Sequence, residues 1–442
     1  MFAAVMKLVS FLILSAAICH AQNGSLPNDY NSVSTDGLIS NSSRYNTILR
    51  VDNGTYGPQL EEVHYFYKYW PVGIAVSSQG RIFVTYTRGE YDYTLAEVAN
   101  KTSERPYPSQ DIQLAPDQLN TTFNGIPFGS DNASALNSVQ ALHITPASST
   151  RPETLWLIDT GRPTIQDSTG SYTMPYAQPG GPKLIGISLD NDTITDTYTF
   201  PPDVHFPDSY LNDLRFDLRP TINAAYLVDS SNEGRPGFIM VNLTTGDSWR
   251  RLSYHPSVLV DYNALPVYQG HPWYYRNPNQ PRSFFREGLD GIQISPDGAY
   301  IYYSPLSSQN LYRVPTANLL APTSDPLSEQ AASNNVSWLG QRGGPANGFE
   351  GDTNGRIYMC MPTQNAVFYW DERDLGVHAF VRDPRIIWPD GASIGQDGYI
   401  YVIVNQLPYM DTWNNGVNAR QYPGTILRAR LPDGGSKITG LV

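Results

Sequence analysis

The sequence predicts an all-β protein built as a six-bladed β-propeller. A short hairpin with an aromatic residue in its second strand occurs six times along the 442 residues. The chain also contains 36 glycines, 35 prolines and 30 tyrosines, a composition that favours short strands and tight turns over helices. A chain of this length is too long for one ordinary compact core, whereas a repeat architecture can grow around an axis.

Each repeat carries an apolar–aromatic–apolar triplet behind a turn, and in four repeats that turn ends in glycine, as in Pro296-Asp297-Gly298. The triplets are Ile82-Phe83-Val84, Leu155-Trp156-Leu157, Ala225-Tyr226-Leu227, Ile301-Tyr302-Tyr303, Ile357-Tyr358-Met359 and Ile400-Tyr401-Val402. A single hairpin cannot bury its own faces, so neighbouring hairpins have to pack side by side. A closed radial array does this without exposing strand edges.

The strand-like segment Val63 to Tyr67 precedes the first hairpin, which begins near Val72. We expect this segment to form the outermost strand of the last blade, beside Thr425 to Leu431, and thereby to close the ring. The predicted organisation is a signal peptide over 1–21, an N-terminal extension over 22–60 and the propeller over 61–442.

The first residues have the features of a secretory signal peptide. Lys7 supplies a positive charge, Leu8 to Ile18 is a short apolar run, and Cys19-His20-Ala21 favours cleavage before Gln22. An uncleaved anchor is the alternative, but the apolar run is short for spanning a bilayer. We therefore expect a secreted, extracellular protein that has no membrane contact after cleavage.

Nine Asn-X-Ser/Thr sequons predict N-glycosylation and agree with passage through the secretory pathway. They are Asn23, Asn41, Asn53, Asn100, Asn120, Asn132, Asn191, Asn242 and Asn335. Once Cys19 is removed, Cys360 is the only thiol, so an intrachain disulfide is excluded. Cys360 stands in an apolar run and is expected to be buried and inert.

Charge and motifs limit the partners and cofactors. The formal net charge is −12 and there is no Lys/Arg-rich run, so nucleic acid and anionic membranes are not expected partners. The sequence has no convincing dinucleotide-binding fingerprint, phosphate-binding loop or CxxC motif, and its histidines lack zinc-type spacing. We predict a small-molecule ligand or substrate, no organic cofactor and no metal site, with calcium as the alternative. The oligomeric state is not determined by the sequence.

Long stretches of the mature chain resemble the major royal jelly protein/yellow family, in particular its microbial members. They include Gly73 to Val76, Thr94 to Val98, Ser138 to Leu142, Asp208 to Asp217, Arg342 to Gly348 and Val404 to Leu407. The resemblance implies a secreted six-bladed propeller with a ligand-binding central channel. Members of the family include non-catalytic binders of biogenic amines and proteins associated with pigment formation through conversion of dopachrome-like quinones. Microbial relatives of such propellers also occur beside secondary-metabolite pathways.

Polar side chains start the innermost strand in five of the six repeats: Gln140, Asn212, Asp290, Asn347 and Asp390. The end of the second strand of a blade lies on the same face, which adds Asp229 and Asn405. Connections between blades also reach this face and bring His205, Trp273, Tyr274 and Trp388. A polar floor beneath an aromatic rim predicts a pocket for a flat organic molecule. The alternative for each ring residue is local capping of backbone amides. The aromatic segment 258–286 could equally be an ordinary surface loop.

The first functional hypothesis is cofactor-free isomerisation or cyclisation of a small quinone-type or polyene metabolite in pigment or natural-product biosynthesis. Asp290 and Asp390 are the predicted catalytic residues, because a desolvated carboxyl beside other carboxyls has a raised pKa and can move a proton. Asn212, Asn347 and Gln140 would bind a carbonyl oxygen as charge develops on it. Pericyclic ring closure would need only an enclosed site that holds the reacting ends together.

Three alternatives stay open. A non-catalytic protein could bind a biogenic amine through the acidic ring and through cation–π contacts. A calcium-dependent lactonase would use Asp and Asn oxygens as ligands, although Val72-Gly73 stands where the first repeat would need an acidic ligand. A purely structural secreted protein is the third.

Overall fold

The computed structural model describes residues 52–87, 91–113, 121–123, 126–128, 134–166, 172–174, 176–177 and 180–441. The predicted signal peptide, most of the N-terminal extension and the sequons Asn23, Asn41, Asn120 and Asn132 lie outside the described residues. The chain divides into two units, Met1–Asn53 and Gly54–Val442. All elements below belong to the second unit.

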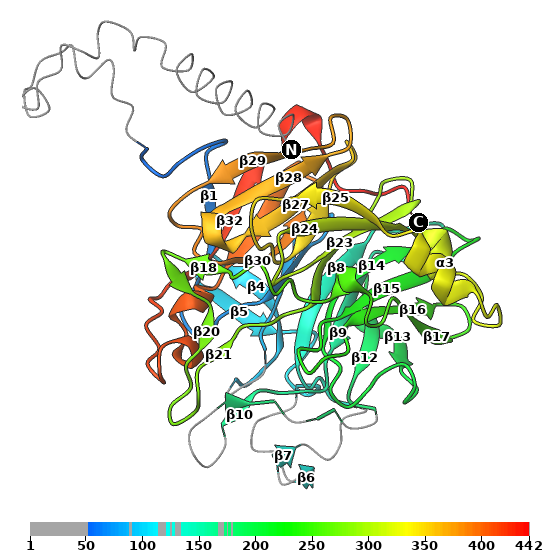
Figure 1. Ribbon diagram of the computed structural model, residues 1–442, viewed down its shortest axis with the longest axis horizontal. Coiled ribbons are helices and arrows are strands. Elements are labelled where there is room, and N and C mark those ends of the chain that lie inside the picture. Colours follow the sequence, from blue (N-terminus) through cyan, green and yellow to red (C-terminus); the bar gives the residue numbers. More distant parts are fainter. Residues whose placement is uncertain are drawn as a thin grey trace, which may run out of the picture. The chain divides into compact units, whose positions relative to one another are not determined.

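Six four-stranded antiparallel sheets make up this unit (Figure 1). The first three blades are β2 (Gly73–Val76), β3 (Ile82–Thr85), β4 (Leu95–Asn100) and β5 (Ser103–Pro106); β8 (Val139–Thr145), β9 (Thr154–Asp159), β12 (Lys183–Ser188) and β13 (Thr193–Thr199); and β14 (Leu211–Asp217), β15 (Ala224–Asp229), β16 (Gly237–Asn242) and β17 (Ser248–Arg251). The last three are β22 (Leu289–Ile294), β23 (Tyr300–Pro305), β24 (Asn310–Pro315) and β25 (Ser337–Gln341); β26 (Phe349–Gly351), β27 (Arg356–Met361), β28 (Ala366–Asp371) and β29 (Gly376–Arg382); and β30 (Pro389–Ile394), β31 (Tyr399–Val404), β32 (Gly424–Arg430) and β1 (Glu61–Phe66).

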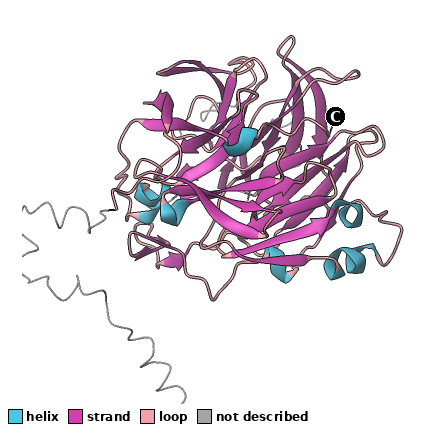
Figure 2. Ribbon diagram, turned by 90° about the horizontal axis from the view of Figure 1, so that it is seen from above, coloured by secondary structure: helices cyan, strands magenta, loops and turns pink. Residues whose placement is uncertain are grey.

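The remaining elements are short. Four two-stranded ribbons are β6 (Thr121–Phe123) with β7 (Ile126–Phe128), β10 (Ile165–Gln166) with β11 (Tyr172–Thr173), β18 (Val267–Tyr268) with β19 (His271–Pro272), and β20 (Tyr274–Tyr275) with β21 (Ser283–Phe284). The described α-helices are α2 (Thr316–Leu319) and α3 (Ser328–Asn334), and strands dominate the view in Figure 2. Within the described residues, no helix combines the length and the apolar character needed to cross a bilayer.

The innermost strands are arranged in a cycle. In the order β2, β8, β14, β22, β26 and β30, each strand contacts the next, and β30 contacts β2. This arrangement is the six-bladed β-propeller that the repeats predicted.

Most of the apolar clusters lie between consecutive blades, and one gathers aromatic residues of the connections around Trp273 and Trp388. Each aromatic residue at the centre of a triplet is at most 5% exposed: Phe83, Trp156, Tyr226, Tyr302, Tyr358 and Tyr401. One cluster joins Trp156 and Ile158 of the second blade to Phe216 and Leu227 of the third. Another joins Cys360 of the fifth blade to Val402 of the sixth. Burying one such side chain stabilises the fold by about 1.5–3 kcal/mol, and an isolated blade would lose most of that burial.

The outer strand of the sixth blade comes from the other end of the propeller sequence. β1 pairs antiparallel with β32, with Glu61 opposite Arg428 and Phe66 opposite Gly424. Phe66 is fully buried and packs in one cluster with Ile426. The edge of β32 is therefore covered by residues that precede it by more than 350 positions in the sequence.

Glycine at the innermost strands lets neighbouring blades approach closely. A Cβ atom on Gly348 would lie 2.6 Å from the carbonyl oxygen of Asp390, and one on Gly391 would lie 3.0 Å from that of Val72. The backbone N–H of Gly348 donates to the same Asp390 oxygen at 3.0 Å. Only glycine leaves room for this contact, which brings the polar residues that precede each glycine towards a common axis.

Candidate functional site

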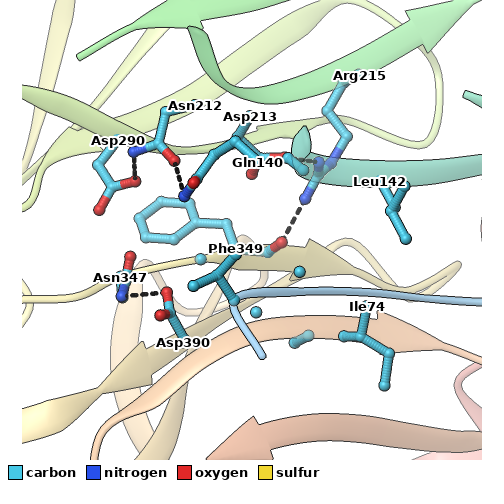
Figure 3. Close-up of a pocket in the computed structure, with 16 residues that line it drawn as sticks. Ile74, Gln140, Leu142, Asn212, Asp213, Arg215, Asp290, Asn347, Phe349 and Asp390 are labelled. Carbon is cyan, nitrogen blue, oxygen red and sulfur yellow. Dashed lines mark hydrogen bonds and ion pairs between the residues drawn. The ribbon is translucent and has the colours of Figure 1, made fainter. Parts of the chain in front are cut away.

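The polar residues at the inner strands converge as predicted by their place in the repeat (Figure 3). Gln140, Asn212, Asp290, Asn347 and Asp390 together line a narrow cavity of about 40 Å³ among the innermost strands. Five residues from five blades therefore reach one place, because the cycle of inner strands brings the same position of each repeat to the axis.

One hydrogen-bond chain crosses three blades. The Tyr210 hydroxyl donates to Gln140 Oε1 at 2.7 Å, and Gln140 Nε2 donates to Asn212 Oδ1 at 3.0 Å. Asn212 Nδ2 then donates to Asp290 Oδ1 at 2.7 Å and to Ser230 Oγ at 3.0 Å. Both N–H groups of Asn212 are therefore used, and this amide orients Asp290.

A second set of amides holds Asp390. Asn347 Nδ2 donates to Asp390 Oδ1 at 2.6 Å, and Asn405 Nδ2 donates to Asp390 Oδ2 and to the Pro71 carbonyl. Asn405 was predicted to lie near the ring, and the structure places it against a ring carboxylate. Asn212 and Asn347 were predicted to bind a substrate carbonyl oxygen. In the structure their side-chain amides donate to the carboxyl groups of Asp290 and Asp390 instead.

A wider cavity of about 220 Å³ adjoins the ring, and we call it the central cavity. Gln140, Asn212, Asp290, Asn347 and Asp390 form part of its wall. Further wall residues are Arg162, Tyr210, Tyr275, Phe285, Glu287 and Trp388. The predicted polar floor and an aromatic wall that includes Trp388 thus face one space. This space is large enough for a ring-sized molecule, because a cavity of about 150 Å³ already holds benzene.

Three carboxyl groups of the central cavity, Glu287, Asp290 and Asp390, form no ion pair with any cation in the described part of the chain. Burial raises the pKa of Asp390 to about 7, against the lowering effect of the hydrogen bonds from Asn405 and Asn347. Burial raises the pKa of Glu287 to about 8. It also raises the pKa of Asp290 well above its usual value, with further contributions from the neighbouring charges of Glu287 and Asp390. Asp290 is buried and the other two residues are half-buried, and loss of water around a carboxyl disfavours its charged form.

The cations nearest to this site are engaged elsewhere. Arg215 pairs with Asp213 at 2.8 Å, and burial still raises the pKa of Asp213 to about 6. Arg342 is fully buried and donates to the carbonyls of Pro305 and Ser308, and burial lowers its pKa to about 9. Arg162 lines the central cavity and pairs with Glu233 at 2.7 Å. The three carboxyls of the cavity therefore have raised pKa values and no ion-pair partner among the described residues.

The predicted site residues Asp229 and His205 do not line the central cavity. Asp229 is fully buried, pairs with Arg250 at 2.9 Å and accepts from Ser209 Oγ and the Tyr210 N–H. This is the local backbone capping that stood as the alternative, and it positions Tyr210. Burial lowers the pKa of His205 to about 4, and its ring stacks on Phe200.

The predicted aromatic rim is divided. Trp388 lines the central cavity, while Trp273 packs behind it with ring centroids 4.5 Å apart. Tyr274 packs on Phe284 and, with Trp273, lines a separate cavity of about 250 Å³. Of the three predicted aromatic residues, Trp388 is therefore the one on the central cavity wall.

Glu287 lines the central cavity but was not among the predicted site residues. This residue stands three positions before Asp290, where the connection from the third blade enters β22, and its carboxyl lies at the central cavity. A second acidic residue close to the polar start of an inner strand is the signal that could have revealed it.

No group of three or more His, Cys, Asp and Glu side chains is placed to hold a metal ion among the residues that the structure describes. In the central cavity, the carboxyl oxygens of Asp290 and Asp390 accept hydrogen bonds from the side-chain amides of Asn212 and Asn347.

Comparison with known proteins identifies the family. The family model for the major royal jelly protein matches residues 149–437, which is more than half of the chain. The chain belongs to the major royal jelly protein family. This confirms the resemblance found in the sequence. The match spans the blades except the first blade, the innermost strand β8 of the second and the outer strand β1 of the last.

A search of curated proteins found no match to this member of the major royal jelly protein family. The similar solved structures share little sequence identity with it. A luciferin-regenerating enzyme is 12% identical with a TM-score of 0.47, and the match covers 87% of this chain and 99% of that one. Virginiamycin B lyase from Staphylococcus aureus is 14% identical with a TM-score of 0.42, covering 84% and 99%. The calcium-binding protein regucalcin from Agrobacterium tumefaciens is 12% identical with a TM-score of 0.43, covering 84% and 95%.

Proposed function

We propose that the protein catalyses a cofactor-free isomerisation or cyclisation of a small quinone-type or polyene metabolite by moving a proton in the central cavity. The observation that carries this proposal is the group of Glu287, Asp290 and Asp390 in one cavity, without an ion-pair partner in the described chain. A carboxyl whose pKa lies near 7 is present in both protonation states at neutral pH, as acid–base catalysis requires.

The proposed chemistry is a proton shift that leaves the composition of the substrate unchanged. Ionised Asp390 takes a proton from a carbon next to the substrate carbonyl, and the C–H electron pair moves into an enolate or extended dienolate. A protonated carboxyl, Asp290 or Glu287, returns a proton at another carbon, so the cavity begins and ends the cycle with the same number of protons. The amides of Asn212, Asn347 and Asn405 keep the two aspartates in place.

The aromatic wall supports a flat substrate. Trp388 and Phe285 line the cavity beside the carboxyls, so a flat substrate packed on them would displace water from the carboxyls. A dry wall strengthens the electrostatic effect of each carboxyl on a developing charge. For a pericyclic closure, the same wall would hold the reacting ends together without a proton shift.

The test is turnover of dopachrome and of a panel of polyenones by the purified protein in D₂O. Deuterium incorporated into the product by the wild-type protein, and lost in Asp290→Asn and Asp390→Asn, is the expected result. Asp203→Asn, at an exposed position away from the cavity, is the matched control and keeps full activity. Absence of product across the panel, with folded protein, would reject the proposal.

Binding of an amine without turnover is the second candidate function. The same carboxyls lie beside Tyr275, Phe285 and Trp388, so an ammonium group would find both negative charge and aromatic faces. Calorimetry with tyramine decides between the two. Tight binding that releases protons at about pH 6, without any substrate conversion, would favour the binder.

We further propose that the protein acts outside the cell as a glycoprotein. Four sequon asparagines in the described chain are exposed, namely Asn53, Asn100, Asn191 and Asn335, and Asn242 is half-buried. Exposed positions are those that a glycosyltransferase can reach. Mass spectrometry of peptides from the secreted protein, before and after glycosidase treatment, would show which asparagines are modified. Unmodified asparagines at all nine sites would reject the proposal.

A further inference from the structure

A second cavity adjoins the central cavity, between the first and the last blade. It has a volume of about 340 Å³, and we call it the side chamber. Trp70 and Tyr91 contribute to it from the start of the propeller sequence, whereas Met410, Thr412 and Tyr422 come from the connection between β31 and β32. The chamber thus exists because the two ends of the propeller sequence lie side by side.

The side chamber and the central cavity share part of their walls. Val72, Thr87, Thr164 and Leu407 line both spaces. Asn405 also lines the side chamber, and its amide donates to Asp390, which lines the central cavity. A ligand whose reacting end reaches Asp390 can therefore extend past these shared residues into the chamber.

The chamber has an ordered aromatic wall. The ring of Tyr422 stacks on Trp70 with centroids 4.7 Å apart and planes 13° apart. The Tyr422 hydroxyl donates to the Lys68 carbonyl at 2.9 Å, which holds the ring in place although it is 48% exposed. Tyr91 stacks on Tyr69 at 4.1 Å. Rings that are already fixed lose little entropy when a flat molecule packs against them.

Two wall residues also have unsatisfied polar atoms. Within the described chain, Thr412 Oγ1 and Asn405 Oδ1 are buried without a hydrogen-bond partner. Such atoms are rare in native interiors and mark places where another polar group completes the structure. A polar substituent on a ligand in the chamber would supply that partner after a small rotation of the Thr412 side chain.

We propose that the side chamber binds a flat, conjugated tail of the substrate, so that the substrate class is an elongated aromatic or polyene compound rather than a single ring. This inference rests on the proposed function, because it places the reacting head of the same molecule at Asp290 and Asp390. The central cavity, at about 220 Å³, is the smaller of the two spaces and takes the head, and the chamber, at about 340 Å³, takes the tail.

Calorimetry with two matched probes, measured without oxygen, tests the inference. 4-Methylcatechol has a ring-sized head alone, and 4-styrylcatechol carries the same head with a conjugated tail. We expect the wild-type protein to bind 4-styrylcatechol at least about tenfold more tightly, because burial of the tail removes apolar surface from water. Tyr422→Leu reduces that advantage by about three- to tenfold and leaves the affinity for 4-methylcatechol unchanged.

Two further variants control the result. Met410→Phe fills the chamber from another side and also removes the advantage of the long probe, which guards against a local rearrangement in Tyr422→Leu. Tyr262→Leu changes an exposed tyrosine that lines neither cavity and keeps the advantage.

The outcomes separate the two proposals. Equal affinities for both probes, or an advantage that survives both chamber variants, overturn the side-chamber inference and leave the proton-transfer proposal standing. Binding of both probes that Asp390→Asn does not alter, with no turnover in the D₂O assay, counts against the proposed function instead. Absence of binding by either probe rejects the long-substrate inference for catechol heads, and the D₂O assay then decides the function alone.

Discussion

The side-chain amide of Asn347 donates a hydrogen bond of 2.6 Å to Oδ1 of Asp390, although the two residues are 43 positions apart and belong to neighbouring blades. Asn405 donates to the other oxygen of the same carboxyl. Burial raises the pKa of Asp390 to about 7, and these two donors oppose the increase because they stabilise the ionised form. The acidity of the proposed base is thus set by contacts between repeats.

Asn347→Leu tests this balance. Loss of one donor to the carboxylate raises the pKa of Asp390 by about one unit, because a hydrogen bond to a charged group contributes about 1.5–3 kcal/mol. The acid limb of the pH profile of kcat/KM therefore moves to higher pH, and activity returns in alkaline buffer. A uniform loss of kcat at every pH, with the limb unmoved, would show that Asn347 acts in another way.

Comparison of Asp290→Asn with Asp229→Asn distinguishes a residue needed for turnover from one needed for stability. Asp290→Asn lowers turnover by about 100-fold or more, because it removes an acid–base group. Its melting temperature stays equal or rises, since a buried carboxyl beside two others is lost. Asp229→Asn leaves Arg250 buried without its partner and costs about 3 kcal/mol of unfolding free energy. Denaturant unfolding and steady-state kinetics measure both, and a reversed pattern would contradict the assignment.

The stability of the protein depends on pH through the cavity carboxyls. Glu287 has a pKa of about 8 when folded and near its ordinary value of 4.5 when unfolded, so the folded state holds the extra proton between these values. Stability from this group is fully present below the unfolded pKa and is lost as the pH rises through the folded pKa.

The window from pH 6.5 to 8.5 isolates this effect. The buried His143 and His205 have lowered pKa values and act in the opposite direction, but only below their unfolded pKa of 6.5. We expect the melting temperature to fall from pH 6.5 to 8.5, and to fall less in Glu287→Gln. Scanning calorimetry in matched buffers measures it, and identical slopes for both proteins would refute the shifted pKa.

Gly348→Ala tests the close approach of the inner strands. The new Cβ atom would lie 2.6 Å from the Asp390 carbonyl oxygen, so the fifth and sixth blades have to separate locally. We expect a loss of stability of about 1–3 kcal/mol from overpacking and a displaced Asp390 with reduced turnover. Gly440→Ala, whose Cβ atom meets nothing nearer than 3.9 Å, is the matched control. Equal stability and equal turnover of the two variants would contradict the steric explanation.

Phe66→Ala tests the contribution of β1 to the sixth blade. Phe66 is fully buried against Ile426 and Tyr86, so its truncation leaves a cavity and costs about 3–5 kcal/mol. Loosening of β1 would also expose the edge of β32, which promotes aggregation. Chemical denaturation with light scattering follows both effects. An unchanged midpoint would mean that the ring does not depend on this strand.

The sequence by itself determined the blades and the positions that face the axis. The hairpins have local signals, namely a turn, an aromatic triplet and a polar residue at the start of the inner strand, and these repeat in a register that can be counted. Asp290 and Asp390 could be identified in this way, because equivalent positions of a cyclic repeat must meet at its centre.

The tertiary structure alone decided which carboxyls meet a cation. Asp229 and Asp290 were both predicted to face the axis, yet Asp229 is paired with Arg250 and Asp290 is left with an amide donor. The packing of the connections also lies beyond sequence reasoning, because nothing local brings Trp70 against Tyr422. Repeats encode their own strands by short-range chemistry, whereas the cavities depend on packing between segments that are distant in the chain and meet only when the blades are assembled.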